Sequence, residues 1–262
     1  MKTITITFGE QSENHVGMKI FGDGLAEEGY NFCDLVIAKD IFEVHGCECE
    51  LVDLKAFLDE EERRVAEDCW ILIIRKGVDR ILEAYEKNKG ELYEELSALD
   101  VDKKYFDRRR GKVLNKNARW NLCFGEVSKS PNYENGEGRV VGYWELELLS
   151  IIREELPTFL GEKAKNLETE ANYYYDIRKC GIGFHGDSER KKVVAFRLGE
   201  TMKLHYQWFL NSKSVGRRAE FFLDDGDMYV MSEKATGFDW KKKKFLTIRH
   251  AAGAEKFLKT KN

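Results

Sequence analysis

Hydrophobic and polar residues alternate differently in successive parts of the chain. Residues 3–8 read TITITF, a period-two alternation that is typical of a half-buried strand. Residues 69–75 form a short apolar run, which we interpret as a buried strand. Helical spacing of apolar residues predicts a helix over 77–96 and an amphipathic helix over 143–156, ending where a proline follows. These patterns predict mixed α/β structure for residues 1–170.

The pattern changes in the last third of the chain. Residues 171–262 contain short segments rich in aromatic and β-branched residues, separated by turn residues: NYYYD, GIGFHGD, VVAFRLG, KLHYQWFL, AEFFLDDGDMYVM and FLTIRHA. Several short strands at such spacing are typical of a β-sandwich or barrel. We therefore expect an α+β protein in which a C-terminal β-barrel packs against the α/β portion, as two regions or as one continuous domain.

Composition narrows the class of protein. The 262 residues suffice for a sizeable core, and no apolar run is long enough to cross a membrane. The N-terminus lacks the apolar core of a signal peptide, so we expect an intracellular protein, cytoplasmic or nuclear. Six Cys without a CxxC pair support neither a zinc ribbon nor a disulfide framework. No P-loop, GxGxxG or GxSxG motif supports another enzyme class, and nothing indicates an oligomeric state.

One short motif indicates metal chemistry. His185 and Asp187 are separated by one glycine at the end of an apolar segment, and alternate residues of a strand point the same way. Mononuclear iron sites use two imidazoles and one carboxylate and leave the other positions open. His250, 65 residues later (250 − 185), lies near the end of the last clear strand and is the candidate second imidazole. The alternative is that these are polar residues that close strands.

The residues around this motif resemble the Fe(II)- and 2-oxoglutarate-dependent oxygenases. NYYYD and GIGFHGDSER are similar to the Asn-x-Tyr and HxDxE run of AlkB-type dioxygenases, and DDGDMYVM is similar to the turn and strand before their distal His. TIRHAAGAEKFLK is similar to the distal-His segment of prolyl hydroxylase-type members. The resemblance covers residues 172–262. It implies a double-stranded β-helix (a jelly-roll, cupin-like fold) with Fe(II) as cofactor and with 2-oxoglutarate and O2 as cosubstrates.

The two resemblances assign the site residues differently. An AlkB-type alignment expects a distal His soon after DMYVM, where the chain has none, and makes Arg249 the family arginine. The prolyl hydroxylase-like alignment, which we prefer, supplies His250 as the third ligand after His185 and Asp187. If His250 is not a ligand, the next candidates are Glu233, Asp239 and His205.

The cosubstrate needs a fixed cation for its distal carboxylate. The candidates are Lys256, Lys259 and Arg249; strand alternation turns Arg249 away from a metal-bound His250 and favours Lys256. The resembled Asn-x-Tyr motif implies that Asn172 and Tyr174 hydrogen-bond the same cosubstrate. The alternatives are that the lysines belong to a solvated C-terminal tail and that the tyrosine is a core residue.

The resemblance therefore predicts a dioxygenase that hydroxylates a macromolecular substrate. DKKYFDRRRGK and WKKKKF interleave basic and aromatic residues, a pattern suited to phosphate contacts and base stacking, and this places nucleic acid slightly ahead of protein. The alternative for these basic runs is a solvated face, which the net charge of −4 favours, and the TIRHAAG similarity indicates a protein side chain such as Pro or Lys as the substrate. The remaining alternative is a non-catalytic, cupin-like binding or interaction protein.

Overall fold

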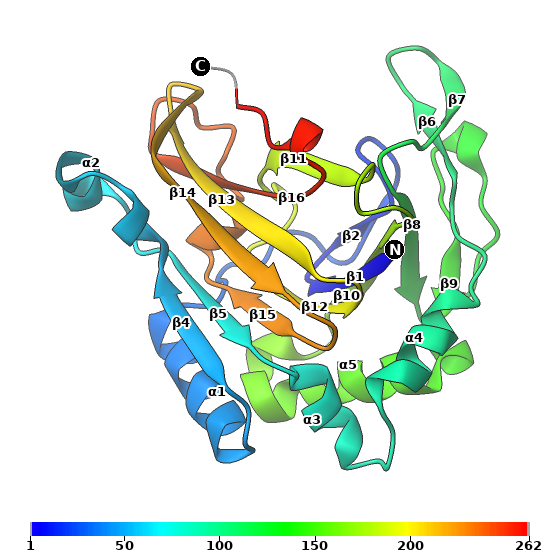
Figure 1. The fold of residues 1–262 in the computed structure, drawn as a ribbon. Coiled ribbons are helices and arrows are strands. Elements are labelled where there is room, and N and C mark those ends of the chain that lie inside the picture. The colour runs from blue at the N-terminus through cyan, green and yellow to red at the C-terminus, as the bar shows by residue number, and fades with distance from the viewer. Residues whose placement is uncertain (1, 261–262) are drawn as a thin grey trace.

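Two β-sheets and a layer of helices build the protein, and the computed structural model describes residues 2–260 (Figure 1). The larger sheet has eight strands, in the order β4 (Cys49–Asp53), β5 (Trp70–Ile74), β15 (Met228–Met231), β12 (Val193–Gly199), β1 (Thr3–Gly9), β10 (Glu168–Tyr174), β8 (Trp120–Gly125) and β9 (Val140–Gly142). The smaller sheet has the order β11 (Gly181–His185), β16 (Thr247–Gly253), β13 (Met202–Leu210) and β14 (Lys213–Leu223). Neighbouring strands pair antiparallel except β8 and β9.

Helices and two small strand pairs complete the described part of the chain. The strand pairs are β2 (Ser12–Glu13) with β3 (Ile20–Phe21) and β6 (Lys104–Asp107) with β7 (Lys112–Asn115). The α-helices are α1 (Phe32–Val44), α2 (Glu60–Val65), α3 (Gly77–Glu83), α4 (Lys89–Ser97) and α5 (Glu147–Leu160). Short 3-10 helices are η1 (Leu54–Phe57), η2 (Tyr133–Asn135), η3 (Tyr143–Glu145), η4 (Glu162–Ala164), η5 (Lys234–Thr236) and η6 (Glu255–Phe257).

Strand β1 lies in the middle of the larger sheet, between β10 and β12. All seven of its residues are buried, so the prediction of a half-buried strand is wrong for one face. The alternation itself is real, because Ile4, Ile6 and Phe8 belong to the core under the helices while Thr5 and Thr7 line a cavity on the other face. The polar face is buried because the smaller sheet covers it.

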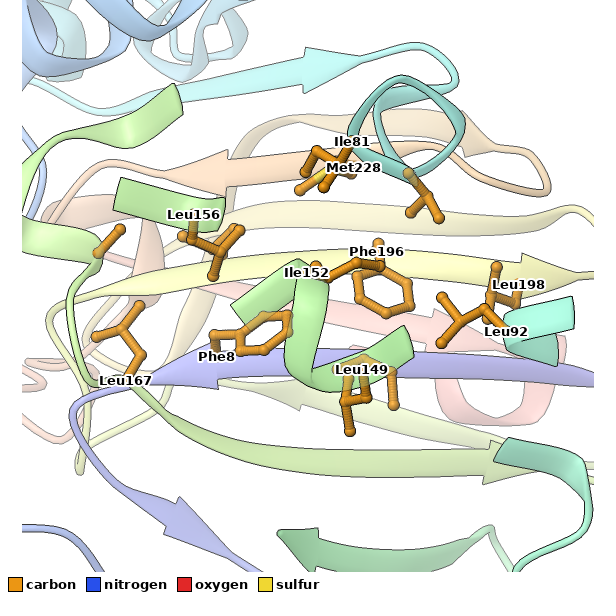
Figure 2. Packing of buried hydrophobic residues seen from close by; sticks show 14 of the residues in the cluster. Phe8, Ile81, Leu92, Leu149, Ile152, Leu156, Leu167, Phe196, Leu198 and Met228 are labelled. Atoms are coloured by element: carbon orange, nitrogen blue, oxygen red, sulfur yellow. The ribbon is translucent and has the colours of Figure 1, made fainter. Parts of the chain in front are cut away.

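Two apolar cores lie on the two faces of the larger sheet. Under the helices, Phe8 of β1 and Phe196 of β12 pack against Leu149 and Ile152 of α5 (Figure 2). Between the sheets, a second core includes side chains of β5, β12, β15, β13 and β16. The buried Trp208 of β13 belongs to it, and its indole N–H donates to the carbonyl of Leu54 at 2.9 Å. Apolar side chains therefore fill one end of the space between the two sheets, and the cavity occupies the other end.

Local signals set the helix boundaries differently from the sequence prediction. The single helix predicted over 77–96 is two helices, α3 and α4, because the chain turns between them with Glu86 at φ 58°. Asn88 then starts α4 with a capping box to Glu91. Helix α5 continues past Pro157 to Leu160 instead of ending before the proline.

The larger sheet takes strands from both predicted regions. The predicted boundary after residue 170 falls inside β10, and β10 and β12 both pair with β1 from the first region. The α+β class is confirmed in its coarse form, a β-rich protein with few helices. Within residues 2–260, no helix has the length and apolar character needed to cross a membrane.

Candidate metal centre

Three side chains predicted as metal ligands converge in one place. His185 ends β11 and pairs directly with His250 on β16. Asp187 follows β11, and one of its carboxylate oxygens lies 3.4 Å from Nε2 of His185 and 3.6 Å from Nε2 of His250. One ligand atom from each residue lies within 4.8 Å of the other two. The structure thus brings together residues that are 65 positions apart (250 − 185), as the sequence predicted.

The loop after β11 fixes Asp187 beside the strand rather than on it. The Asp187 backbone N–H donates to the carbonyl of Thr236 at 3.0 Å. Gly186 lies against Gly237, and an added Cβ at Gly186 would sit 2.1 Å from the Gly237 carbonyl oxygen. A glycine is therefore needed between the two ligands, because any side chain would push the loops apart.

Hydrogen bonding orients the His185 ring. Its Nδ1 lies 2.8 Å from the carbonyl oxygen of Gly183, which can only accept, so Nδ1 carries the proton. Nε2 is then the ring nitrogen that faces Asp187 and is available to a metal ion. Metal-binding histidines are typically oriented in this way through the other ring nitrogen.

The Arg190 guanidinium lies beside the Asp187 carboxylate. This buried side chain forms an ion pair with Glu170 and donates from Nε to the Gln11 carbonyl at 2.8 Å, and its Nη1 lies 3.7 Å from the Asp187 carboxylate. Burial alone would raise the pKa of Asp187, but His250, His185 and Arg190 together hold that pKa well below its usual range. Asp187 is therefore a carboxylate at neutral pH, the form that binds metal ions.

The geometry and chemistry of the three residues fit a divalent metal ion. A metal with nitrogen and oxygen ligands at about 2.0 to 2.2 Å holds neighbouring ligand atoms about 3 Å apart in an octahedral site. The 3.4 and 3.6 Å separations are close to that value. Two imidazoles and one carboxylate on one side of a cavity leave the opposite positions open.

The same cavity contains a buried arginine, Arg197, whose hydrogen-bond donors are only partly paired among the described residues. Thr5 on β1 lies in register with Asn172 on β10 and with Arg197 on β12, and all three line the cavity together with Tyr174. Arg197 is 1% exposed, and its Nε and Nη1 have no hydrogen-bond partner among the described residues; the Thr5 hydroxyl also has none. Buried cationic donors are normally paired, so this row is built to receive an anion.

The amide of Asn172 is oriented by neighbours on the next strand. Its Oδ1 accepts from Nε of Arg119 at 2.5 Å and from Nδ2 of Asn121 at 2.8 Å. With the oxygen occupied, the Asn172 amide group is left as a donor. Asn121 in turn accepts a hydrogen bond from the buried Lys116 at 2.9 Å.

Lys116 provides a pH test of this network. Burial lowers its pKa to about 7, whereas an ordinary lysine titrates near 10.4. Between these values the unfolded chain binds a proton that the folded chain does not, so the free energy of unfolding rises with pH, by at most about 1.4 kcal/mol per pH unit. We expect urea denaturation from pH 7 to pH 9 to show the wild type gaining stability relative to Lys116→Met. The exposed Lys104, changed to Met, serves as control; parallel curves for wild type and Lys116→Met would refute the buried, neutral lysine.

The other predicted cosubstrate residues divide into two groups. Asn172 and Tyr174 line the cavity, and their hydrogen bonds to a cosubstrate stay a prediction. Arg249 and Lys256 do not. Arg249 points to the outer face of the smaller sheet, with its guanidinium carbon 4.0 Å from the centre of the Phe209 ring, because its neighbour His250 points inward. Lys256 lies in η6 with its ammonium 5.0 Å from the Phe257 ring centre. The arginines that line the cavity are Arg119, Arg190 and Arg197; the first two donate to protein acceptors, whereas Nε and Nη1 of Arg197 have no partner among residues 2–260.

Sequence reasoning missed Arg197, although a signal was present. Arg197 is the one charged residue within the otherwise apolar segment VVAFRLG, and a lone charge in a buried strand requires a partner or a function. Glu13 and Glu170 were also missed. Both lie outside residues 171–262, Glu13 in β2 and Glu170 in the first part of β10.

Comparison with known proteins places the chain in a family. No family model matches it. An uncharacterized protein of Acanthamoeba polyphaga mimivirus is 44% identical to it over 258 residues, which cover 98% of this chain and 98% of the viral protein. The chain belongs to the same family as that viral protein. Because the match covers 98% of each chain, the family resemblance extends to the N-terminal portion as well as to the strands that carry the candidate ligands.

Proposed function

We propose that the protein is an Fe(II)- and 2-oxoglutarate-dependent dioxygenase. One observation carries the proposal: two imidazoles and one carboxylate converge in a cavity that also contains a buried arginine, whose Nε and Nη1 have no partner among residues 2–260. The ligand set is the facial arrangement used by non-haem Fe(II) oxygenases. The arginine adds what a dicarboxylic 2-oxo acid requires, a fixed cation for its distal carboxylate.

The topology supports a double-stranded β-helix. From β10 to β16 the chain crosses between the two sheets after every strand except β13, with β10, β12 and β15 in the larger sheet and β11, β13, β14 and β16 in the smaller. These are seven strands, and a jelly roll has eight. We propose that β1 is the eighth, because it lies between β10 and β12 and completes the row β10-β1-β12-β15 opposite β11-β16-β13-β14.

The residues of this chain have separate tasks in the proposed reaction. His185, Asp187 and His250 hold the metal, and Arg190 holds Asp187 in its ionised, correctly placed form. Arg197, Thr5 and the Asn172 amide bind the carboxylate end of the cosubstrate. When bound, Fe(II) supplies the centre at which O2 is reduced while 2-oxoglutarate is oxidised to succinate and CO2 and one oxygen atom enters a substrate C–H bond. The apolar side chains between the sheets exclude bulk water from this cavity.

The proposal predicts that metal and cosubstrate bind together. We expect anaerobic calorimetric titrations to show 2-oxoglutarate binding to the Fe(II)-loaded protein at least about tenfold more tightly than to the metal-free protein, because the oxo acid gains metal ligands. Succinate, which lacks the oxo group, serves as the matched control. Metal binding without any effect on 2-oxoglutarate affinity contradicts the proposal and favours a binding protein or another metal-dependent chemistry.

Nucleic acid is the first candidate for the macromolecular substrate. The exposed lysines 241–244 follow Trp240, whose indole N–H donates to Ser188 at 3.2 Å, one residue from Asp187. On another side, Tyr105 of the basic β6–β7 hairpin stacks at 3.8 Å on His15, which lines the cavity. Both basic segments thus lie beside the proposed centre. Their lysines and arginines would bind the phosphates of a nucleic acid through charge. An oligonucleotide affinity that is unchanged when the four lysines become Gln would make a protein side chain the better candidate.

A further inference from the structure

The cavity around the candidate metal centre is electrically polarised along β1. Thr5 lies in the row that contains Arg197, and Thr7, two residues further, lies in register with Glu170. Two residues of a strand span about 6.6 Å, so the positive and negative rows are separated by about one side-chain width. The carboxylates of Glu13 and Glu189 line the cavity as well. Glu13 is tied to the negative row, because its backbone N–H donates to Glu170 at 2.9 Å.

The negative end has more carboxylates than cations. One guanidinium, that of Arg190, forms an ion pair with Glu170 and lies 3.5 Å from Glu189 and 3.7 Å from Asp187. Glu13 has no cationic partner within 4.0 Å among residues 2–260; its carboxylate accepts the Gly17 backbone N–H at 2.8 Å, and burial raises its pKa.

The histidine at the rim does not neutralise this end. His15 lines the same cavity, and burial lowers its pKa to about 4, so it is uncharged at neutral pH. Burial also raises the pKa of Glu189, to about 7, so Glu13 and Glu189 line the cavity as half-buried carboxyl groups that a cation entering beside the metal would hold in the ionised form. Neither side chain is needed to hold the metal, since neither belongs to the converging triad.

The positive end of the cavity, at Arg197, is the proposed binding site of the cosubstrate carboxylate. The buried Arg197, with its unpartnered Nε and Nη1, is suited to one carboxylate and leaves the acidic end for a second ligand. We propose that Glu13 and Glu189 select a substrate group that is cationic and donates hydrogen bonds, such as an ammonium or a guanidinium. This inference rests on the proposed function. A neutral group of the same shape would offer the half-buried Glu13 carboxylate no cationic partner, and such mismatches are strongly rejected by polar sites.

Two isosteric probes test this selection: n-butylguanidinium, which is cationic, and n-butylurea, which is neutral. Ligand-observed saturation-transfer NMR measures their binding with or without metal, and Mn²⁺-induced relaxation of the probe protons reports proximity to the triad. We expect the wild type to prefer butylguanidinium by at least about tenfold and Glu13→Gln and Glu189→Gln each to lose about tenfold of that affinity, the usual size of a charge-assisted hydrogen bond. Gln at position 13 still accepts the Gly17 N–H, so the loop is kept. The exposed Glu154 on α5, changed to Gln, is the control.

The outcomes separate this inference from the metal proposal. Equal binding of the two probes, no binding of butylguanidinium, or an affinity unaffected by both Gln variants overturns the selection, even when Mn²⁺ binds normally. Carboxylate-dependent butylguanidinium binding in a protein that takes up no Mn²⁺ supports the cation-selecting cavity and contradicts the metal centre. Mn²⁺ affinity equal in wild type and both variants shows that the variants are folded.

Discussion

Asp187→Ala and His185→Ala should each lower the affinity of the protein for Mn²⁺ or Fe(II) by more than about a hundredfold. Loss of a group that only orients a ligand typically costs 10- to 100-fold in metal affinity, and loss of a direct ligand costs more. Asp187 is also the one residue whose carboxylate faces both imidazoles, at 3.4 and 3.6 Å. Without it, two neutral rings would remain to hold a doubly charged ion.

The measurement is Mn²⁺ binding by electron paramagnetic resonance, with circular dichroism as the check on folding. His45→Ala is the matched control, because His45 is exposed at the end of α1, far in sequence from the triad, with its Nδ1 2.8 Å from the Ile41 carbonyl oxygen. Unchanged Mn²⁺ affinity in both Asp187→Ala and His185→Ala, with the fold intact, would remove the metal centre altogether.

Arg197→Met should have two opposite effects. We expect the affinity for 2-oxoglutarate to fall by about a hundredfold or more, because the carboxylate would enter a buried site without a cation. We also expect the free protein to become more stable, since the variant removes a buried guanidinium whose Nε and Nη1 have no partner. Gain of stability with loss of binding is typical of a residue kept for function.

Arg249→Met is the control that separates the two candidate cations. Arg249 packs on Phe209 and Trp240 on the outer face of the smaller sheet, so its loss should leave 2-oxoglutarate affinity within about twofold. Calorimetry of the metal-loaded proteins gives the affinities, and thermal unfolding of the metal-free proteins gives the stabilities. If Arg249→Met loses the cosubstrate and Arg197→Met keeps it, the assignment made from the cavity is wrong.

Local patterns in the sequence predicted those parts of the site that depend on neighbouring residues. His185, Asp187 and the strands around them are visible because a strand, a glycine and two polar side chains follow one another within a few positions. His250 could be added because the metal chemistry required a second imidazole and few were available. These predictions needed no knowledge of which strands pair.

The position of Arg197 in the cavity could not be predicted from local patterns. Arg197 and Asn172 come together because Thr5, more than 160 residues earlier, lies between them in register. Strand pairing over such separations leaves no mark on local periodicity. Lys256 and Arg249 were chosen for closeness to His250 in the sequence, whereas β1, from the other end of the chain, supplies the strand beside Arg197.

The same long-range pairing explains the misreading of β1. TITITF alternates as an amphipathic strand does, but its threonine face meets a cavity between two sheets and not solvent. Threonine is polar enough to suggest exposure and small enough to line a buried site. Only the position of the second sheet distinguishes the two cases.

The most direct test of the proposed activity is succinate formation from 2-oxoglutarate. The wild-type protein, loaded with Fe(II) and 2-oxoglutarate without oxygen and then exposed to air, should release succinate and CO2 in equal amounts even without its substrate. His185→Ala should release neither above the level of free Fe(II). Succinate at the same rate from both proteins, or none from a wild type that binds metal and 2-oxoglutarate together, would contradict the assignment as a dioxygenase.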